Sequence, residues 1–188
     1  MKMFDEDIKI ASPDNIKKVL EESRKIKAVS GSEEYKRESA KGNTEKAKVL
    51  GSKLANEVVD NISRFTMEDE PCEDALLSVQ KGVLMTFAAI VCLEAAASSV
   101  VAQAAKSSFN KELETIAPWL YKAVSDSNAF TFYYLAYRRG AEVDRRIGQT
   151  FAMLCSHDGD PIYQELGEAI YCWFSSKVAD RVKDSGIE

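Results

Sequence analysis

Five side chains between residues 94 and 145 have types and spacing that could form a polar binding pocket: Glu94, Tyr137, Arg138, Asp144 and Arg145. Glu94 is the single formal charge between Lys81 and Lys106. Asp144 interrupts the apolar side of a predicted helix over residues 130–155, which also carries the arginines. A buried carboxylate needs donors such as guanidinium or phenol groups. The set therefore predicts a ligand-binding pocket, for a small molecule or an anion, in which Glu94 faces the Asp144 helix through an arginine.

Structural interpretations of the same residues remain open. Asp144 could make a hydrogen bond to a tyrosine or to a neighbouring helix, and Glu94 could form a buried ion pair that fixes helix register. The arginines could belong to a solvated helix face, because Glu142 lies four residues from both Arg138 and Arg146.

Metal and cofactor chemistry finds little support in the sequence. His157 is the only histidine, and the four cysteines, Cys72, Cys92, Cys155 and Cys172, form no C-x-x-C pair. Glu165 and Glu168 have a spacing used to hold Mg²⁺, but both fall on the polar side of their predicted helix. We therefore expect no metal site and no cofactor, and whether the protein is an enzyme stays open.

Hydrophobic periodicity defines the elements that would position these residues. We expect helices over about 12–29, 44–65, 72–106, 108–124, 130–155 and 161–183, with Pro118 kinking or splitting the fourth and Thr44 and Asp160 acting as caps. Residues 30–43 are predicted to be a mobile linker or a poorly anchored short helix, and the least protected part of the ordered chain.

The helix over about 72–106 has apolar side chains on every side, so we expect it to be long, buried and central. The predicted fold is an all-α, single-domain bundle of about six helices around it. Residues 1–43 would be a loosely packed N-terminal helix and linker. The segment between Lys81 and Lys106 is long enough to span a bilayer, but Glu94 and the many alanines argue against a membrane protein.

Composition narrows the function classes further. The chain has 188 residues, 45% hydrophobic and 29% charged, a globular balance. A net charge of −5 without a dense basic run argues against nucleic-acid binding. The acidic N-terminus has no signal-peptide core and the cysteines are scattered, so we expect a cytoplasmic protein. The leading functional hypothesis is helix-mediated self-association, as a homo-oligomer, or binding of a protein partner; the alternative is the small-molecule or anion-binding pocket.

Overall fold

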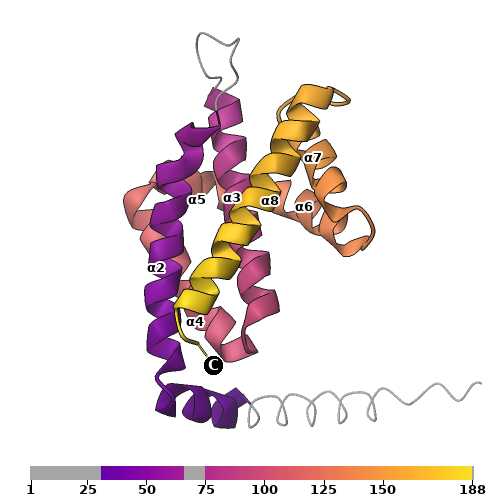
Figure 1. Ribbon diagram of the computed structural model, residues 1–188. Helices are drawn as coiled ribbons and strands as arrows, with labels where there is room; N and C mark the ends of the chain where they lie inside the picture. The colour runs from indigo at the N-terminus through magenta and orange to yellow at the C-terminus, as the bar shows by residue number, and fades with distance from the viewer. Residues whose placement is uncertain (1–30, 66–74, 188) are drawn as a thin grey trace, which may run out of the picture.

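A computed structural model describes residues 31–65 and 75–187, and this part of the chain consists of helices without a β-strand (Figure 1). The all-α prediction is confirmed, with more helices than six. Residues 31–40 are helical. The elements that follow are α2 (Asn43–Asn61), η1 (Ile62–Arg64), α3 (Ala75–Ala96), α4 (Ser99–Ile116), α5 (Pro118–Asp126), α6 (Ala129–Arg138), α7 (Val143–Leu154) and α8 (Pro161–Asp184). The helix expected over 12–29 lies outside the described residues.

Helix α3 occupies the centre of the bundle. Residues 80–89 are all buried, and α2, α4, α5, α6, α7 and α8 each contact this helix. By length and composition α3 could cross a membrane, but 72% of its apolar window is buried inside the protein, and the core helix of a soluble protein passes the same test. The predicted central position of this segment is confirmed.

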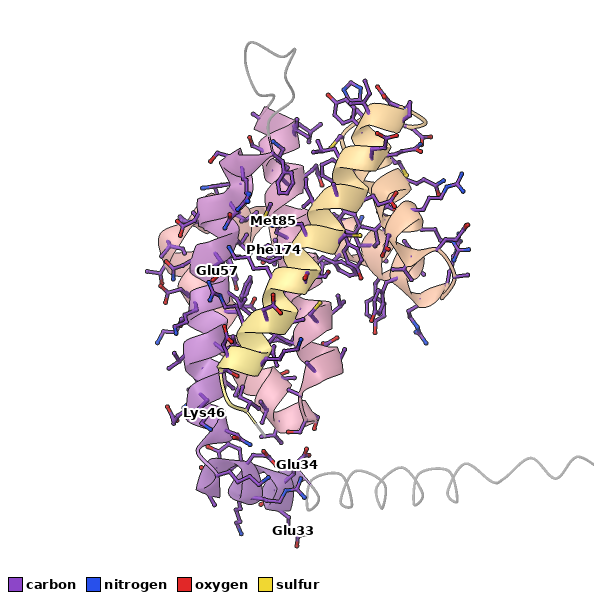
Figure 2. All side chains as sticks on the ribbon, in the orientation of Figure 1. Glu33, Glu34, Lys46, Glu57, Met85 and Phe174 are labelled. Carbon is purple, nitrogen blue, oxygen red and sulfur yellow. The ribbon has the colours of Figure 1, made fainter. Side chains whose placement is uncertain are left out.

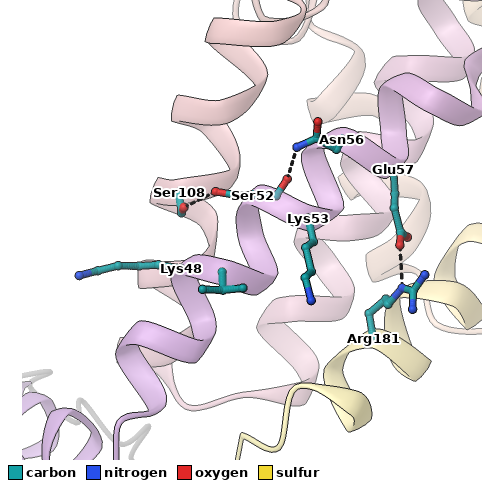
Figure 3. A pocket seen from close by; sticks show the side chains of 8 residues that line it. Lys48, Ser52, Lys53, Asn56, Glu57, Ser108 and Arg181 are labelled. Atoms are coloured by element: carbon teal, nitrogen blue, oxygen red, sulfur yellow. Dashed lines mark hydrogen bonds and ion pairs between the residues drawn. The ribbon is translucent and has the colours of Figure 1, made fainter.

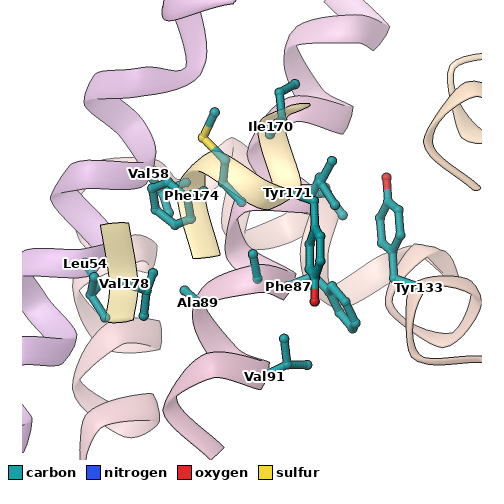
Figure 4. Packing of buried hydrophobic residues seen from close by; sticks show 14 of the residues in the cluster. Leu54, Val58, Phe87, Ala89, Val91, Tyr133, Ile170, Tyr171, Phe174 and Val178 are labelled. Atoms are coloured by element: carbon teal, nitrogen blue, oxygen red, sulfur yellow. The ribbon is translucent and has the colours of Figure 1, made fainter. Parts of the chain in front are cut away.

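Aromatic and aliphatic side chains close the core on both sides of α3 (Figure 4). On one side the Phe87 ring packs edge-on against Phe130, with 5.6 Å between centroids, and lies 5.4 Å from Tyr133 of α6. Met85 of α3 and Phe174 of α8, both labelled in Figure 2, are fully buried in the same core cluster. Apolar burial of this kind is the main source of stability in such a bundle.

The long central helix expected over 72–106 is in fact two helices. Ser98 has extended backbone dihedrals, φ −60° and ψ 157°, and its hydroxyl accepts a hydrogen bond from the Val101 amide at 3.5 Å. Helix α3 therefore ends at Ala96 and the chain turns into α4. A serine cap satisfies an amide at the start of a helix, and here it prevails over the continuous run of helix-forming alanines.

The helix expected over 130–155 is also divided. Gly140 has φ +82° and Glu142 has φ 50°, so the backbone leaves the right-handed region between α6 and α7. The periodicity predicted Gly140 in the interior of a helix, but it is a turn residue. At Pro118 the predicted split is confirmed, because α4 ends at Ile116 and the proline occupies the first turn of α5.

Two of the expected helix starts can be compared with the structure. Asp160 caps α8 as predicted, with its carboxylate accepting the Ile162 amide at 2.9 Å. Thr44 is not a cap, because Gly42, with φ 75°, occupies that position before α2. Of the two alternatives for residues 30–43, a mobile linker or a short helix, the structure shows a helix over residues 31–40. The side-chain amide of Asn43 donates a hydrogen bond to the buried Glu38 carboxylate at 2.7 Å.

Glycines allow two pairs of helices to approach closely. A β-carbon on Gly51 of α2 would clash with the Ala105 carbonyl of α4 and lie 3.0 Å from the Phe109 amide nitrogen. A β-carbon on Gly148 of α7 would meet the Gln164 carbonyl of α8. Gly51 and Gly148 therefore each mark a point of close helix packing.

The Gly51→Ala substitution is predicted to destabilise the fold by about 1–3 kcal/mol, because the obstructing Ala105 and Phe109 atoms are backbone and must move with α4. In an unobstructed helix the same change would stabilise by up to about 1 kcal/mol. Urea unfolding followed by circular dichroism measures the difference. Val49→Ala, at an exposed site on α2, is the control. A Gly51→Ala protein at least as stable as the wild type would contradict the close packing.

Candidate functional site

Glu94 does not lie in a buried pocket, so the predicted contact between Glu94 and the Asp144 helix is wrong. Its side chain is 42% exposed, and it accepts a hydrogen bond from the Lys106 ammonium of α4 at 2.5 Å. A small hollow of about 320 Å³ beside this pair is lined by α3 and α4 residues and by none of the arginines. The division of the 72–106 helix explains the error, because it brings α4 back beside the end of α3.

Asp144 and Tyr137 both lie near Tyr171 of α8. The Asp144 carboxylate makes a hydrogen bond with the Cys172 thiol, and both Asp144 and Tyr137 lie close enough to Tyr171 to act on its hydroxyl electrostatically. Asp144 is nevertheless exposed, so its predicted position on the buried, apolar side of the helix is wrong. Its bond to α8 is the kind of contact that the structural interpretation of this residue gave. Tyr137 is half-buried, with its ring 6.3 Å from Phe87.

The two arginines of the predicted pocket point into solvent. Arg138 is exposed, and its guanidinium lies 5.9 Å from the centre of the Tyr134 ring. Arg145 is also exposed, with 4.0 Å between its Nη1 and the Glu142 carboxylate. Both contacts stay within the α6–α7 region. This arrangement matches the solvated-face interpretation of the arginines.

The titratable groups around Asp144 are poorly suited to nucleophilic or base chemistry. Burial, followed by the Asp144 charge, raises the pKa of the Cys172 thiol. Burial also raises the pKa of Cys92, whose thiol lies 4.0 Å from the Ser175 carbonyl, and the pKa of Tyr171. Because the thiolate is the reactive form of cysteine, both thiols stay protonated and unreactive near neutral pH. Among residues 31–65 and 75–187, no group of three or more His, Cys, Asp or Glu side chains could hold a metal ion.

Lys81 is a buried residue whose burial the sequence did not predict. In the sequence Lys81 marks the start of the apolar segment. In the structure it is fully buried in α3, and its ammonium donates a hydrogen bond to the Phe65 carbonyl. A buried lysine requires such partners, because a bare charge in the core is very costly. This hydrogen bond links Phe65, the residue that follows η1, to the central helix.

Glu94→Gln is predicted to change the free energy of unfolding by less than about 1 kcal/mol, because exposed ion pairs contribute little. If Glu94 were buried and paired with an arginine, the same substitution would lower the free energy of unfolding by about 3–5 kcal/mol. Thermal or urea unfolding distinguishes the two values. Lys106→Gln should give a similarly small change.

Asp144→Asn is predicted to speed the alkylation of Cys172 by iodoacetamide at mildly alkaline pH. The substitution removes a negative charge and a hydrogen bond that both raise the thiol pKa, so the thiolate fraction at a given pH should rise. Mass spectrometry of the modified peptide measures the rate. Asp158→Asn, an exposed acid that does not act on Cys172, is the control, and equal rates in the two variants would contradict the contact.

A surface groove between α6 and α7 is a better candidate for a functional site. It has a volume of about 410 Å³, and its walls include the apolar side chains of Phe132, Leu135 and Met153 with Arg139, Arg146 and Asp158 at the polar positions. Leu135 is 54% exposed and Phe132 43% exposed. We call this surface the α6–α7 groove.

The position of the α6–α7 groove follows from the local sequence. Tyr133 and Ala136 of α6 are buried, and Phe130 and Tyr137 pack on Phe87, so these residues hold the helix against α3. The run from Phe132 to Leu135 is apolar at every position, and one helix cannot turn four consecutive side chains to the same side. The prediction of one continuous helix over residues 130–155 gave no reason to expect Phe132 at the surface. The uninterrupted apolar run was the available signal.

Comparisons of the chain with protein-family models, with curated proteins and with solved structures found no match.

Proposed function

We propose that this protein acts through helix-mediated protein binding at the α6–α7 groove, and that the occupant is a second copy of the chain. The observation that supports this is the exposed apolar surface of Phe132, Leu135 and Met153 on two adjacent helices. A surface helix normally turns polar residues outward. Contiguous apolar patches rimmed by polar groups are typical of protein-binding sites.

The charges of the α6–α7 groove favour a second copy as the occupant. The groove carries the cations Arg139 and Arg146 together with the carboxylate of Asp158, so the surface is complementary to itself. In a two-fold dimer each arginine can meet the acid of the opposite copy.

Leu135→Glu is predicted to weaken self-association at least about tenfold, because it places a charge at the centre of the apolar contact. Sedimentation velocity over a wide range of protein concentrations measures the monomer–dimer equilibrium. The substitution should leave the fold intact, since Leu135 is exposed and glutamate suits a helix.

Val49→Glu is the matched control, since Val49 is 56% exposed and lies on α2, on the other side of the bundle from α6 and α7 (Figure 1). It adds the same charge and should leave the dimer unchanged. A wild-type protein that stays monomeric at every concentration would overturn the proposal. So would equal weakening by the two substitutions, which would indicate net charge as the cause.

A further inference from the structure

A hollow on the described surface lies between α2, α4 and α8 (Figure 3) and shares no lining residue with the α6–α7 groove. It has a volume of about 670 Å³, and its polar walls are formed by Lys48, Ser52, Lys53, Asn56, Ser108 and Arg181. A second hollow of about 440 Å³ shares Val49, Lys53 and Arg181 with it, so the two form one surface, which we call the basic groove.

The basic groove has a local charge opposite to that of the whole chain. Three cations and one carboxylate, Glu57, line its larger hollow. The smaller hollow adds Lys46, Glu45 and Asp184, so four cations and three carboxylates border the whole groove, whereas the chain has a net charge of −5. Glu57 is already engaged, since it accepts from Arg181 at 2.6 Å and lies 3.6 Å from the Lys177 ammonium. Its charge is therefore compensated by α8 and does little to repel an anion that enters beside it.

Donors remain available on each wall of the basic groove. Arg181 uses its Nε–H for Glu57, and its Nη1 lies 3.9 Å from Asp184, but the exposed guanidinium has further N–H groups. Lys53 is exposed, and the ion pairs of residues 31–65 and 75–187 do not include it. Ser52 and Ser108 share one hydrogen bond at 2.9 Å, so one of the two hydroxyls keeps a free O–H.

We propose that the basic groove binds a small organic phosphate monoester. Arginine, lysine and hydroxyl donors converging on one volume are the groups that bind phosphate oxygens. The volume falls within the range of about 300–1,000 Å³ that small-molecule sites occupy. Lys53 borders both hollows, so the phosphate would sit beside it and the organic part would extend along Val49. This inference is independent of self-association.

Isothermal titration of the full chain with glycerol phosphate at low ionic strength tests the proposal. Lys53→Gln is expected to weaken binding by about tenfold, the effect of losing a charge-assisted hydrogen bond. The fold should be unaffected because this side chain is exposed. Lys122→Gln on α5 removes the same charge from an exposed site outside the basic groove and should leave affinity unchanged.

Three results would overturn the proposal. Glycerol phosphate that does not bind would remove it directly. Equal weakening by Lys53→Gln and Lys122→Gln would show a general effect of net charge instead of a site. Inorganic phosphate that binds as tightly as glycerol phosphate would show that the groove takes the free anion and not its monoester.

Discussion

The burial of α3 on every side is the constraint on which the other helices depend. A helix with apolar side chains all around its axis must be enclosed, so each neighbouring helix has to present an apolar face to it. The enclosure reaches even Lys81, whose buried ammonium bonds the Phe65 carbonyl at the end of η1. It also explains the small residues: a β-carbon on Gly82 would lie 2.8 Å from Leu120 of α5. Covering α3 thus determines where the chain must turn.

Two close helix pairs, joined to each other through α8, form a large part of this enclosure. Helices α2 and α4 approach at Gly51, and α7 and α8 approach at Gly148, in each case with backbone where a side chain would otherwise stand. Helix α8 then joins the pairs, because Trp173 stacks with the Arg64 guanidinium at 4.6 Å and Arg181 bonds Glu57 of α2. These polar contacts lie partly in solvent and set geometry more than stability. Buried apolar area is the larger energetic term.

The sequence was informative where one strong pattern acted alone and misleading where a local signal competed with it. The all-round apolarity of the central segment predicted α3 correctly, and Asp160 and Pro118 marked their boundaries. Ser98 and Gly140 were weak breaks inside long apolar patterns, and both ended helices. A turn changes the direction of the chain and therefore which residues can contact each other. Because the turn at Ser98 was not predicted, Glu94 was expected in the core, whereas it lies at the surface. The pairing of Glu94 with Lys106 depends on that turn, and helical periodicity contains no information about it.

The same breaks determine where exposed chemistry can occur. Had residues 130–155 formed one straight helix, a single apolar side would have packed on the bundle. The turn at Gly140 instead lets α6 and α7 fold against each other, and Tyr133 and Phe151 become buried while Phe132 and Leu135 stay outside. The basic groove has a different origin, since it lies where α2 and α4 meet α8. One surface therefore arises from an interrupted helix and the other from the junction of three helices, which is why neither could be found by examining one helix at a time.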